Sequence, residues 1–191
     1  QDAKQLHGKK MSYNNLQDAS AALDILQEFD ETVCVALKHM NPCGVSLGDT
    51  VYDAYMGAYD ADPISIFGGI VAINGKIDVE TAKEMHKIFL EIILAEDYDD
   101  EALEILKKKK NLRIYQIPKK SERNGKLIKS VRGGILVQDY NDKLYEELKT
   151  VTEKEPTEKE INDMIFGYKI VKHVKSNAVV VVKDGQTFGV G

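Results

Sequence analysis

The hydrophobic pattern of the chain switches repeatedly between strand-like and helix-like segments. Residues 32–37, TVCVAL, are apolar and rich in β-branched side chains, which is typical of a strand buried on both faces of a parallel sheet. Residues 16–29 instead carry apolar side chains at helical spacing. The predicted buried face of this helix consists of Ala19, Ala22, Leu23 and Leu26. Because strands alternate with helices through most of the chain, we predict an α/β layered domain.

Further elements follow from the same two periodicities. Helices are predicted at residues 49–62, 78–92, 99–110 and 156–174. Strands are predicted at residues 112–117 and 133–140, and residues 177–191 predict a hairpin that turns at Asp184-Gly185. Residues 91–95, EIILA, fit either a helix end or a short strand.

The helix at residues 156–174 carries the signals of both a start and a buried face. Thr157 and Glu160 form a capping-box pattern at its beginning. Its apolar side chains predict a stripe that packs against the rest of the protein. The predicted stripe consists of Ile161, Met164, Ile165 and Tyr168.

Turn and loop signals separate these elements. Tyr13–Asn15 and Asn74-Gly75 predict turns. The Asn-Pro pair and the glycine at 41–44 predict a loop in which neither strand nor helix continues. Residues 119–129 predict a loop or hairpin, and residues 141–157 predict a linker or mobile loop.

Composition narrows the class of protein without changing this architecture. The 191 residues are 43% hydrophobic and 30% charged, as in ordinary globular domains. No apolar run is long enough for a membrane span, and the first residues lack the apolar core of a secretory signal, so we expect a cytoplasmic protein. The formal net charge of −5 argues against nucleic-acid binding. The run Lys107–Lys110 is typical of a helix C-terminus.

Lys38 and His39 stand side by side where the strand at 32–37 ends, and strand ends are where ligands bind in open α/β sheets. Histidine titrates near neutrality and is therefore a common general base. A neighbouring lysine disfavours the imidazolium form and can stabilise a developing oxyanion. These residues fit either a catalytic pair or a solvated strand end, and the pattern leaves both readings open.

The alternative interpretation of this segment is a metal site. Cys34, His39 and Cys43 lack both a close Cys-x-x-Cys pair and a fourth ligand, so we predict no metal and place Cys34 in the core. Two cysteines in a chain of this length fit a reducing compartment.

Two further patterns permit a ligand contact. Ile66–Ile70, with its paired glycines, fits either a ligand-contact turn or tight packing. Ser176 and Asn177 fit either a binding position or an Asx turn before a strand. The other histidines, at positions 7, 86 and 173, are interpreted as incidental.

Five segments, in order along the chain, carry a family resemblance. They are QLHGKKMSYNNLQDA, LKHMNPCG, DPISIFGGIVAIN, EALEILKKKKNLR and KSNAVVVVKDGQTFGVG. Together they resemble the bifunctional family that combines 5-aminoimidazole-4-carboxamide ribonucleotide (AICAR) transformylase with IMP cyclohydrolase in purine biosynthesis. The resemblance implies a three-layer α/β/α, cytidine-deaminase-like fold without zinc, and a homodimer. It also implies formyl transfer from 10-formyltetrahydrofolate to the 5-amino group of AICAR.

The resemblance also assigns roles to the Lys-His pair. It implies that His39 accepts the proton and that Lys38 stabilises the transition state. The assignment agrees with the chemistry, because an aromatic amine conjugated to a carboxamide is a poor nucleophile that needs a base. The tetrahedral intermediate carries an O⁻, which a cation or hydrogen-bond donors stabilise.

Four more residues become candidate substrate contacts through the resemblance. Phe67 and Gly68 match the family's Phe-Gly that contacts the nucleotide. Asn177 matches an asparagine near the reacting amine. Glu91 aligns with an acidic residue that binds the nucleotide, although the family often has aspartate there.

The family also has an IMP cyclohydrolase domain before this region and a second deaminase-like unit after it, which holds much of the folate site. We therefore expect residues 1–191 to correspond to the N-terminal part of the transformylase region and to have little or no transformylase activity by themselves. Two alternatives stay open. One is a non-catalytic nucleotide-binding or dimerisation module of the same fold, and the other is a zinc deaminase, which predicts stoichiometric zinc.

Overall fold

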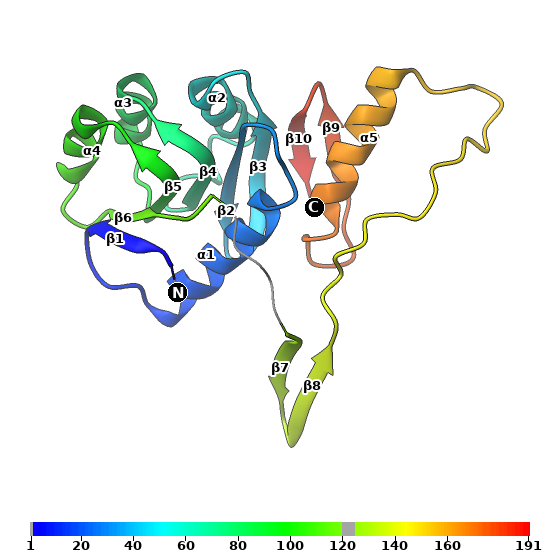
Figure 1. Cartoon of the computed structure of the whole chain (residues 1–191), viewed down its shortest axis with the longest axis horizontal. Coiled ribbons are helices and arrows are strands. Elements are labelled where there is room, and N and C mark those ends of the chain that lie inside the picture. Colours follow the sequence, from blue (N-terminus) through cyan, green and yellow to red (C-terminus); the bar gives the residue numbers. More distant parts are fainter. Residues whose placement is uncertain (1, 120–124) are drawn as a thin grey trace.

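The computed structural model describes residues 2–119 and 125–191, which form five helices and ten strands (Figure 1). The helices are α1 (Tyr13–Leu26), α2 (Val51–Ala61), α3 (Val79–Lys87), α4 (Asp100–Lys107) and α5 (Glu158–Val171). The strands are β1 (Lys4–His7), β2 (Val33–Lys38), β3 (Asn41–Leu47), β4 (Ile70–Ile77), β5 (Ile92–Tyr98), β6 (Arg113–Gln116), β7 (Leu127–Val131), β8 (Gly134–Gln138), β9 (Val180–Lys183) and β10 (Gln186–Val190).

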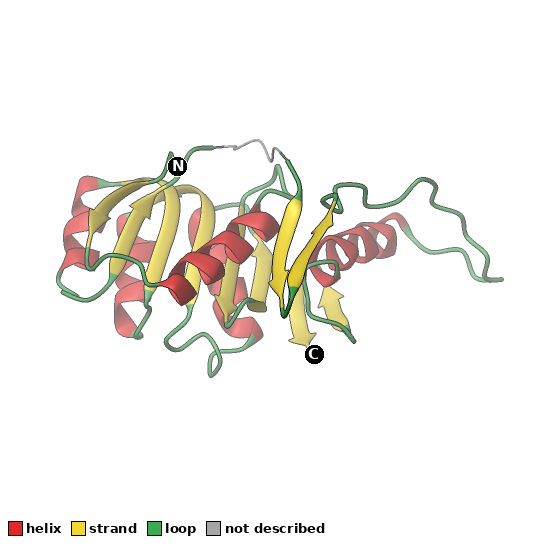
Figure 2. Ribbon diagram, turned by 90° about the horizontal axis from the view of Figure 1, so that it is seen from below, coloured by secondary structure: helices red, strands yellow, loops and turns green. Residues whose placement is uncertain are grey.

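Helices cover both faces of one large sheet (Figure 2). This sheet has eight strands in the order β1-β6-β5-β4-β2-β3-β10-β9, while β7 and β8 form a separate two-stranded sheet. The buried residues of α2, α3 and α4 join one hydrophobic cluster, and those of α1 and α5 join the other. The predicted three-layer α/β/α class is confirmed. Among the helices of the described chain, none has the length and apolar character that a membrane crossing requires.

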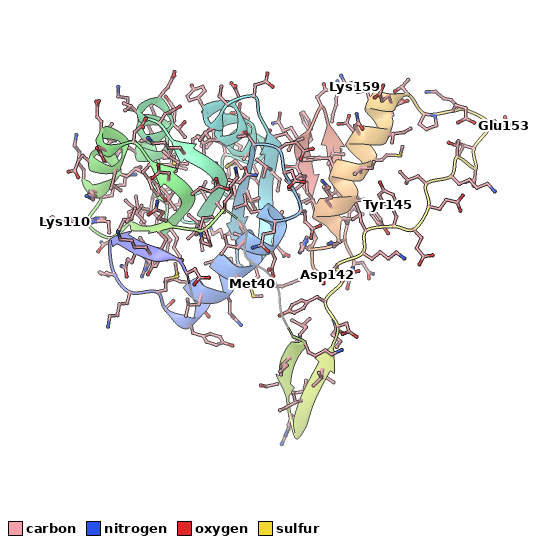
Figure 3. All side chains as sticks on the ribbon, viewed as in Figure 1. Met40, Lys110, Asp142, Tyr145, Glu153 and Lys159 are labelled. Carbon is pink, nitrogen blue, oxygen red and sulfur yellow. The ribbon has the colours of Figure 1, made fainter. Side chains whose placement is uncertain are left out.

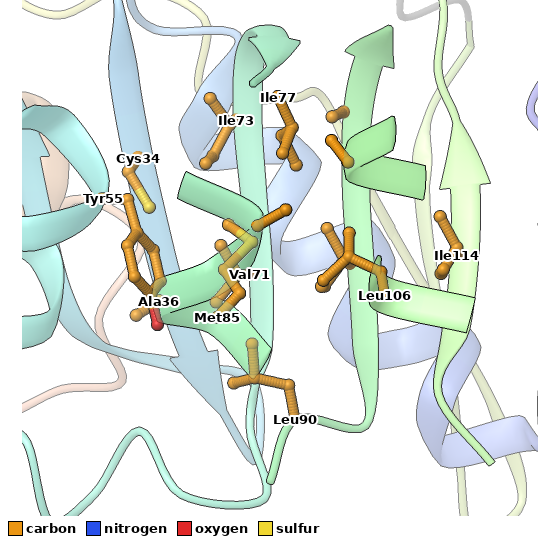
Figure 4. Close-up of a cluster of buried hydrophobic side chains, with 14 of the residues drawn as sticks. Cys34, Ala36, Tyr55, Val71, Ile73, Ile77, Met85, Leu90, Leu106 and Ile114 are labelled. Carbon is orange, nitrogen blue, oxygen red and sulfur yellow. The ribbon is translucent and has the colours of Figure 1, made fainter. Parts of the chain in front are cut away.

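Strand β2 shows how the two clusters share the sheet. Cys34 and Ala36 lie in the cluster that α2, α3 and α4 cover, which Figure 4 shows, whereas Val35 and Leu37 lie in the cluster on the opposite face. The strand is buried on both faces, as predicted, but the prediction of parallel pairing is wrong. β2 runs antiparallel to both β3 and β4, and β4–β5 and β5–β6 are the parallel pairs among the described strands. Burial on both faces therefore reflects the two helix layers rather than strand direction.

The segment at 41–44 is a strand and not the predicted loop. Only His39 and Met40 separate β2 from β3, and Lys38 pairs with Asn41 across the turn. The register shifts between Ala36 and Leu37, and a bulge of this kind lets the ladder accommodate the proline. Gly44 is needed for helix packing, because a Cβ there would lie 2.0 Å from the carbonyl oxygen of Ala58 in α2.

Two predicted turns belong to regular elements instead. Tyr13–Asn15 is the first turn of α1, where Ser12 and Asn15 form a capping box. Asn74-Gly75 lies within β4 at a register shift, and the Asn74 side chain bonds the Val33 amide and the Glu31 carbonyl, each at 2.7 Å. A side chain that pairs with backbone in this way replaces ladder bonds at the bulge.

The remaining segments settle most of the open predictions. The segment at 91–95 belongs to strand β5, and α3 ends at Lys87, earlier than predicted. Asp184 and Gly185 form the predicted hairpin turn, with φ angles of 53° and 69°. Residues 141–157 contain neither helix nor strand. The predicted loop or hairpin at 119–129 lies partly outside the described residues, and its final part begins β7.

Helix α5 starts as predicted but buries a different face. The capping box of Thr157 and Glu160 is confirmed. The predicted stripe is wrong, because Met164 and Tyr168 are 55% and 50% exposed. The buried residues of α5 are Phe166, Gly167 and Ile170. The buried face is turned toward the segment that follows α1, since the Phe166 and Phe29 rings lie 5.5 Å apart.

The predicted stripe of α5 instead faces an open groove of about 1250 Å³. The groove lies between α5, β9 and the extended segment that carries Tyr145, which Figure 3 labels. Leu148, Val151 and Val179 on its walls are 57%, 86% and 68% exposed. This face of the described chain is therefore apolar and accessible.

The β7–β8 hairpin projects away from the main body (Figure 1). Its register places Ile128, Ile135 and Val137 on one face, where they are 65%, 65% and 60% exposed. The opposite face mixes Lys129 with apolar residues. The hairpin therefore exposes an apolar surface away from the main body, although an isolated two-stranded hairpin is only marginally stable in water.

Candidate functional site

The candidate site lies at one end of the strands, where β2 ends and β4, β5 and β6 begin. This row of strand ends is called here the edge of the sheet. Lys38 is the last residue of β2, and His39 and Met40 form the two-residue turn into β3. Both turn residues have left-handed backbones, with φ angles of 55° and 63°. Positive φ at both central positions defines a type I′ hairpin turn, which normally carries Asn-Gly. The side chain of His39 is exposed.

The central peptide of this turn has partners on both of its polar atoms. The Met40 N–H donates to Oδ1 of Asp18 in α1 at 2.8 Å. The His39 carbonyl accepts from Nζ of Lys175 at 3.2 Å, and the Lys175 N–H donates to Oδ1 of Asn41 at 3.3 Å. Figure 3 shows Met40 at the edge of the sheet, beside α1. The turn is thus held between α1 and the segment that follows α5.

The loop before β4 brings the Phe67-Gly68 pair to the same edge. Asp62 orders this loop, because its Oδ1 accepts from the Ser65 amide at 2.8 Å. Hydrogen bonds from the Ser65 side chain and from its amide lower the pKa of Asp62. Lys38 Nζ donates to the Phe67 carbonyl at 2.9 Å. The Phe67 ring is 57% exposed and lies 5.6 Å from the ring of Phe89. The two rings form an apolar wall beside the lysine.

Gly68 and its neighbour depend on being glycine. Gly68 has a φ of 74°, and its N–H donates to the Phe89 carbonyl at 2.8 Å. A Cβ at Gly69 would lie 2.8 Å from the carbonyl oxygen of Leu37. The Gly-Gly pair therefore lets the loop lie directly against the end of β2.

Glu91 lies at the start of β5, and two side chains hold its carboxylate from one side. Its Oε2 accepts from Nδ2 of Asn15 at 3.0 Å and lies 3.4 Å from Nη1 of Arg113. The Glu91 side chain is 40% exposed, whereas that of Arg113 is 16% exposed. Among the described residues both donors lie on Oε2, so within this part of the chain Oε1 can accept a further hydrogen bond.

Asn177 lies in the loop before β9, two residues after Lys175. The two Lys175 contacts fix this loop beside the His39 turn, although 136 residues separate Lys175 from His39. The structure therefore brings together Lys38, His39, Phe67, Gly68 and Glu91 at one edge of the sheet and anchors the Asn177 loop next to them.

The cysteines lie apart from any ligand cluster. Cys34 is buried, and burial raises its pKa. Burial and the nearby Asp62 raise the pKa of Cys43 to about 11, so it is a thiol at neutral pH. Within residues 2–119 and 125–191, no group of three or more His, Cys, Asp and Glu side chains has an arrangement that could hold a metal ion.

Sequence reasoning missed five residues of this edge, namely Asn15, Asp18, Phe89, Arg113 and Lys175. Asn15 was interpreted as part of a turn, so its position on a buried helix face went unrecognised. Arg113 opens a strand that was predicted, and a charged residue at that position was an available signal. Asp18 and Lys175 carry no local pattern, because their partners are distant in sequence.

Comparison with known proteins gives consistent matches along the whole chain. A family model described as the AICARFT/IMPCHase bienzyme matches residues 1–191. A protein named "Bifunctional purine biosynthesis protein PurH" from Clostridium botulinum (strain 657 / Type Ba4) is 57% identical over 188 residues, 98% of this chain and 38% of that protein. Proteins of the same name from Thermoanaerobacter sp. (strain X514) and Caldicellulosiruptor saccharolyticus (strain ATCC 43494 / DSM 8903 / Tp8T 6331) are 55% and 54% identical over 192 residues, all of this chain. The chain spans 37% and 38% of the length of these relatives.

Proposed function

Because the chain belongs to the AICARFT/IMPCHase bienzyme family, we propose that it supplies the AICAR-binding and proton-transfer part of a transformylase in purine biosynthesis. The co-substrate of the proposed reaction is 10-formyltetrahydrofolate, and no metal ion takes part. One observation supports this most directly. The Lys38-His39 pair lies where the Phe67-Gly68 loop and Glu91 converge, so the proposed base, the lysine cation and the proposed nucleotide contacts share one edge of the sheet.

In the proposed reaction, the 5-amino nitrogen of AICAR attacks the formyl carbon and forms a C–N bond. The carbonyl π electrons move to oxygen, and Lys38 stabilises the resulting oxyanion. His39 accepts the proton that the amine nitrogen loses. Collapse of the intermediate breaks the bond to N10 of the folate, and this nitrogen takes up a proton as it leaves. The balanced products are formyl-AICAR and tetrahydrofolate.

The geometry also supports two of the proposed nucleotide-binding roles. The exposed Phe67 ring offers a flat apolar face to the heterocyclic ring of the nucleotide. Glu91 presents Oε1 to an N–H donor such as a carboxamide. We assign Phe67, Gly68, Glu91 and Asn177 to AICAR binding.

Substitution of the binding residues is expected to weaken AICAR binding without preventing folding. In the protein that contains this chain, Glu91→Ala should raise the Kd for AICAR about 10- to 100-fold, because loss of a charge-assisted hydrogen bond costs roughly 1.5–3 kcal/mol. Asn177→Ala should raise it about 10-fold. Isothermal titration calorimetry measures both values, with Glu146→Ala, an exposed carboxylate in the segment that precedes α5, as the control.

This titration, combined with turnover measurements on the same protein, separates the proposal from its alternative, a non-catalytic nucleotide-binding or dimerisation module. A catalytic site predicts AICAR binding together with turnover that depends on His39. Tight AICAR binding with turnover unaffected by His39→Ala would favour the non-catalytic alternative. Absence of any AICAR binding by the whole protein would contradict the binding role itself.

We further propose that the protein acts as a homodimer. The β7–β8 hairpin supports this proposal, since its face of Ile128, Ile135 and Val137 carries no charge and is exposed. Uncharged apolar surface of this kind is typical of interface cores. We propose that a second copy of the protein covers this face of the hairpin.

Charges introduced on this face are expected to convert the dimer to a monomer. The double variant Ile128→Asp/Ile135→Asp would bury two unpaired carboxylates in the interface, which is strongly unfavourable. Sedimentation equilibrium on the whole protein should give the monomer mass at micromolar concentration. Lys129→Ala, on the opposite face of the same hairpin, should remain dimeric. A dimer that survives the double variant would exclude this face from the interface.

A further inference from the structure

The His39–Met40 peptide is the central peptide of a turn that the sequence does not favour. Type I′ turns require a positive φ at both central residues, which glycine and asparagine tolerate best. Here a histidine and a methionine take these positions, with φ angles of 55° and 63°. Left-handed backbone at a methionine is unfavourable, so it persists only where the surroundings hold it.

Two charged side chains of opposite sign contact the two polar atoms of this peptide. The Asp18 carboxylate accepts the Met40 N–H at 2.8 Å, and the Lys175 ammonium donates to the His39 carbonyl at 3.2 Å. In a two-residue hairpin, neither of these atoms belongs to the strand ladder. The contacts therefore act on the orientation of the peptide rather than on strand pairing.

The alternative arrangement of the same turn is type II′, in which only the first central residue keeps a positive φ. Conversion between the two types rotates the central peptide by about half a turn. After this rotation, the carbonyl oxygen would face the Asp18 carboxylate and the N–H would face the Lys175 ammonium. Both contacts would become repulsive, so the charge pair discriminates between the two turn types.

We propose that Asp18 and Lys175 are positioning residues that hold the His39–Met40 turn in its type I′ form and thereby fix the direction of the His39 side chain. This inference rests on the proposed role of His39 as the base. Asp18 comes from α1 and Lys175 from the loop that leads to Asn177. These two contacts therefore link the direction of the His39 side chain to a loop that we assign to AICAR binding.

The inference is tested by steady-state kinetics of formyl transfer with the whole protein that contains this chain. Asp18→Ala should lower kcat about 10- to 100-fold, while the KM for AICAR changes less than threefold. Asp18→Asn keeps an oxygen acceptor for the Met40 N–H and should recover kcat to within about fivefold of the parent. Lys175→Met should lower kcat about tenfold, and Lys175→Arg should restore it. Asp60→Ala and Lys183→Met, exposed residues on α2 and β9, should leave kcat unchanged.

A glycine at position 40 provides the sharper test. Glycine adopts a left-handed backbone without support from neighbours. Met40→Gly in the Asp18→Ala background should therefore raise kcat at least fivefold over Asp18→Ala alone. A residue that only stabilised the fold would not respond to this change. If Asp18→Ala does not fold, the Asp18→Asn and Lys175 variants test the same prediction.

Each outcome has a defined meaning. Unchanged kcat in Asp18→Ala and Lys175→Met, or no rescue by Met40→Gly, would overturn the positioning role. His39→Ala is measured in parallel so that a failure of the proposed function is recognised separately. If His39→Ala keeps full activity, the proposed base is wrong. If His39→Ala loses activity while the Asp18 and Lys175 variants keep it, only the positioning role fails.

Discussion

Replacement of His39 by alanine is expected to lower kcat for formyl transfer to AICAR by about 10²- to 10⁴-fold, the range that general acid–base catalysis contributes. The His39 side chain is exposed at a hairpin turn, so its removal takes away a proton acceptor without opening a cavity in the core. The KM for AICAR should change little, because the proposed nucleotide contacts come from other residues. The measurement is steady-state turnover of the whole protein with saturating 10-formyltetrahydrofolate.

Lys38 and a second histidine provide the comparison for this prediction. Lys38→Met should lower kcat about 10²- to 10³-fold, as loss of an oxyanion-stabilising group does. His7→Ala, at the far edge of the sheet in β1, should leave kcat unchanged. A kcat for His39→Ala within tenfold of the parent would rule out His39 as the base.

The second large effect is expected at Glu28, which joins the end of α1 to the end of α5. Glu28 Oε1 lies 2.8 Å from Lys172 Nζ and 2.9 Å from His173 Nε2. The three side chains are 15%, 8% and 15% exposed. Glu28→Ala leaves Lys172 buried without its partner, so the free energy of unfolding should fall by about 3 kcal/mol. Urea unfolding measures this loss, and Glu146→Ala in an exposed ion pair should cause little change.

The same cluster gives stability a pH dependence of known sign. Burial by itself would raise the pKa of Glu28, but hydrogen bonds from His173 and Lys172 outweigh it, and the pKa lies below its ordinary value. A carboxyl whose pKa is lower in the folded state stabilises the fold above its unfolded pKa, about 4.5. This contribution is lost as the pH falls below that value, through the folded pKa. Stability of the parent should therefore decline more steeply with acidification than that of Glu28→Gln, and equal slopes would contradict the assignment.

The sequence predicted the elements of this fold better than their arrangement. The helix cap at Thr157 and the turn at Asp184-Gly185 are local signals, and the structure contains both. The direction of β2 was mispredicted, because burial on both faces is the same for parallel and antiparallel neighbours. The buried face of α5 was mispredicted because apolar residues occur around most of the helix, and tertiary contacts chose Phe166 and Ile170.

The residues of the candidate site likewise fall into a group that the sequence predicted and a group that it did not. Lys38 and His39 were found from their position at a strand end, and the resemblance supplied the roles of Phe67, Gly68, Glu91 and Asn177. The groups that hold these residues in place were not found. Asp18 contacts Met40 across 22 residues, and Lys175 contacts His39 across 136. Contacts between residues so far apart in the sequence produce no local pattern, and only the folded structure brings these residues together.

The placement of β10 inside the sheet order also determines when the site can form during synthesis. Thr187 Oγ1 accepts from the Val45 N–H across 142 residues, and β10 lies between β3 and β9. A ribosome must therefore complete nearly all of these 191 residues before β3 gains β10 as its second neighbour. Until then, β3 is an open edge strand that is liable to pair with other nascent chains. The Lys175 loop, which docks on the His39 turn, is also made late. The order of synthesis thus makes the contact between the Lys175 loop and the His39 turn one of the last to form in the domain.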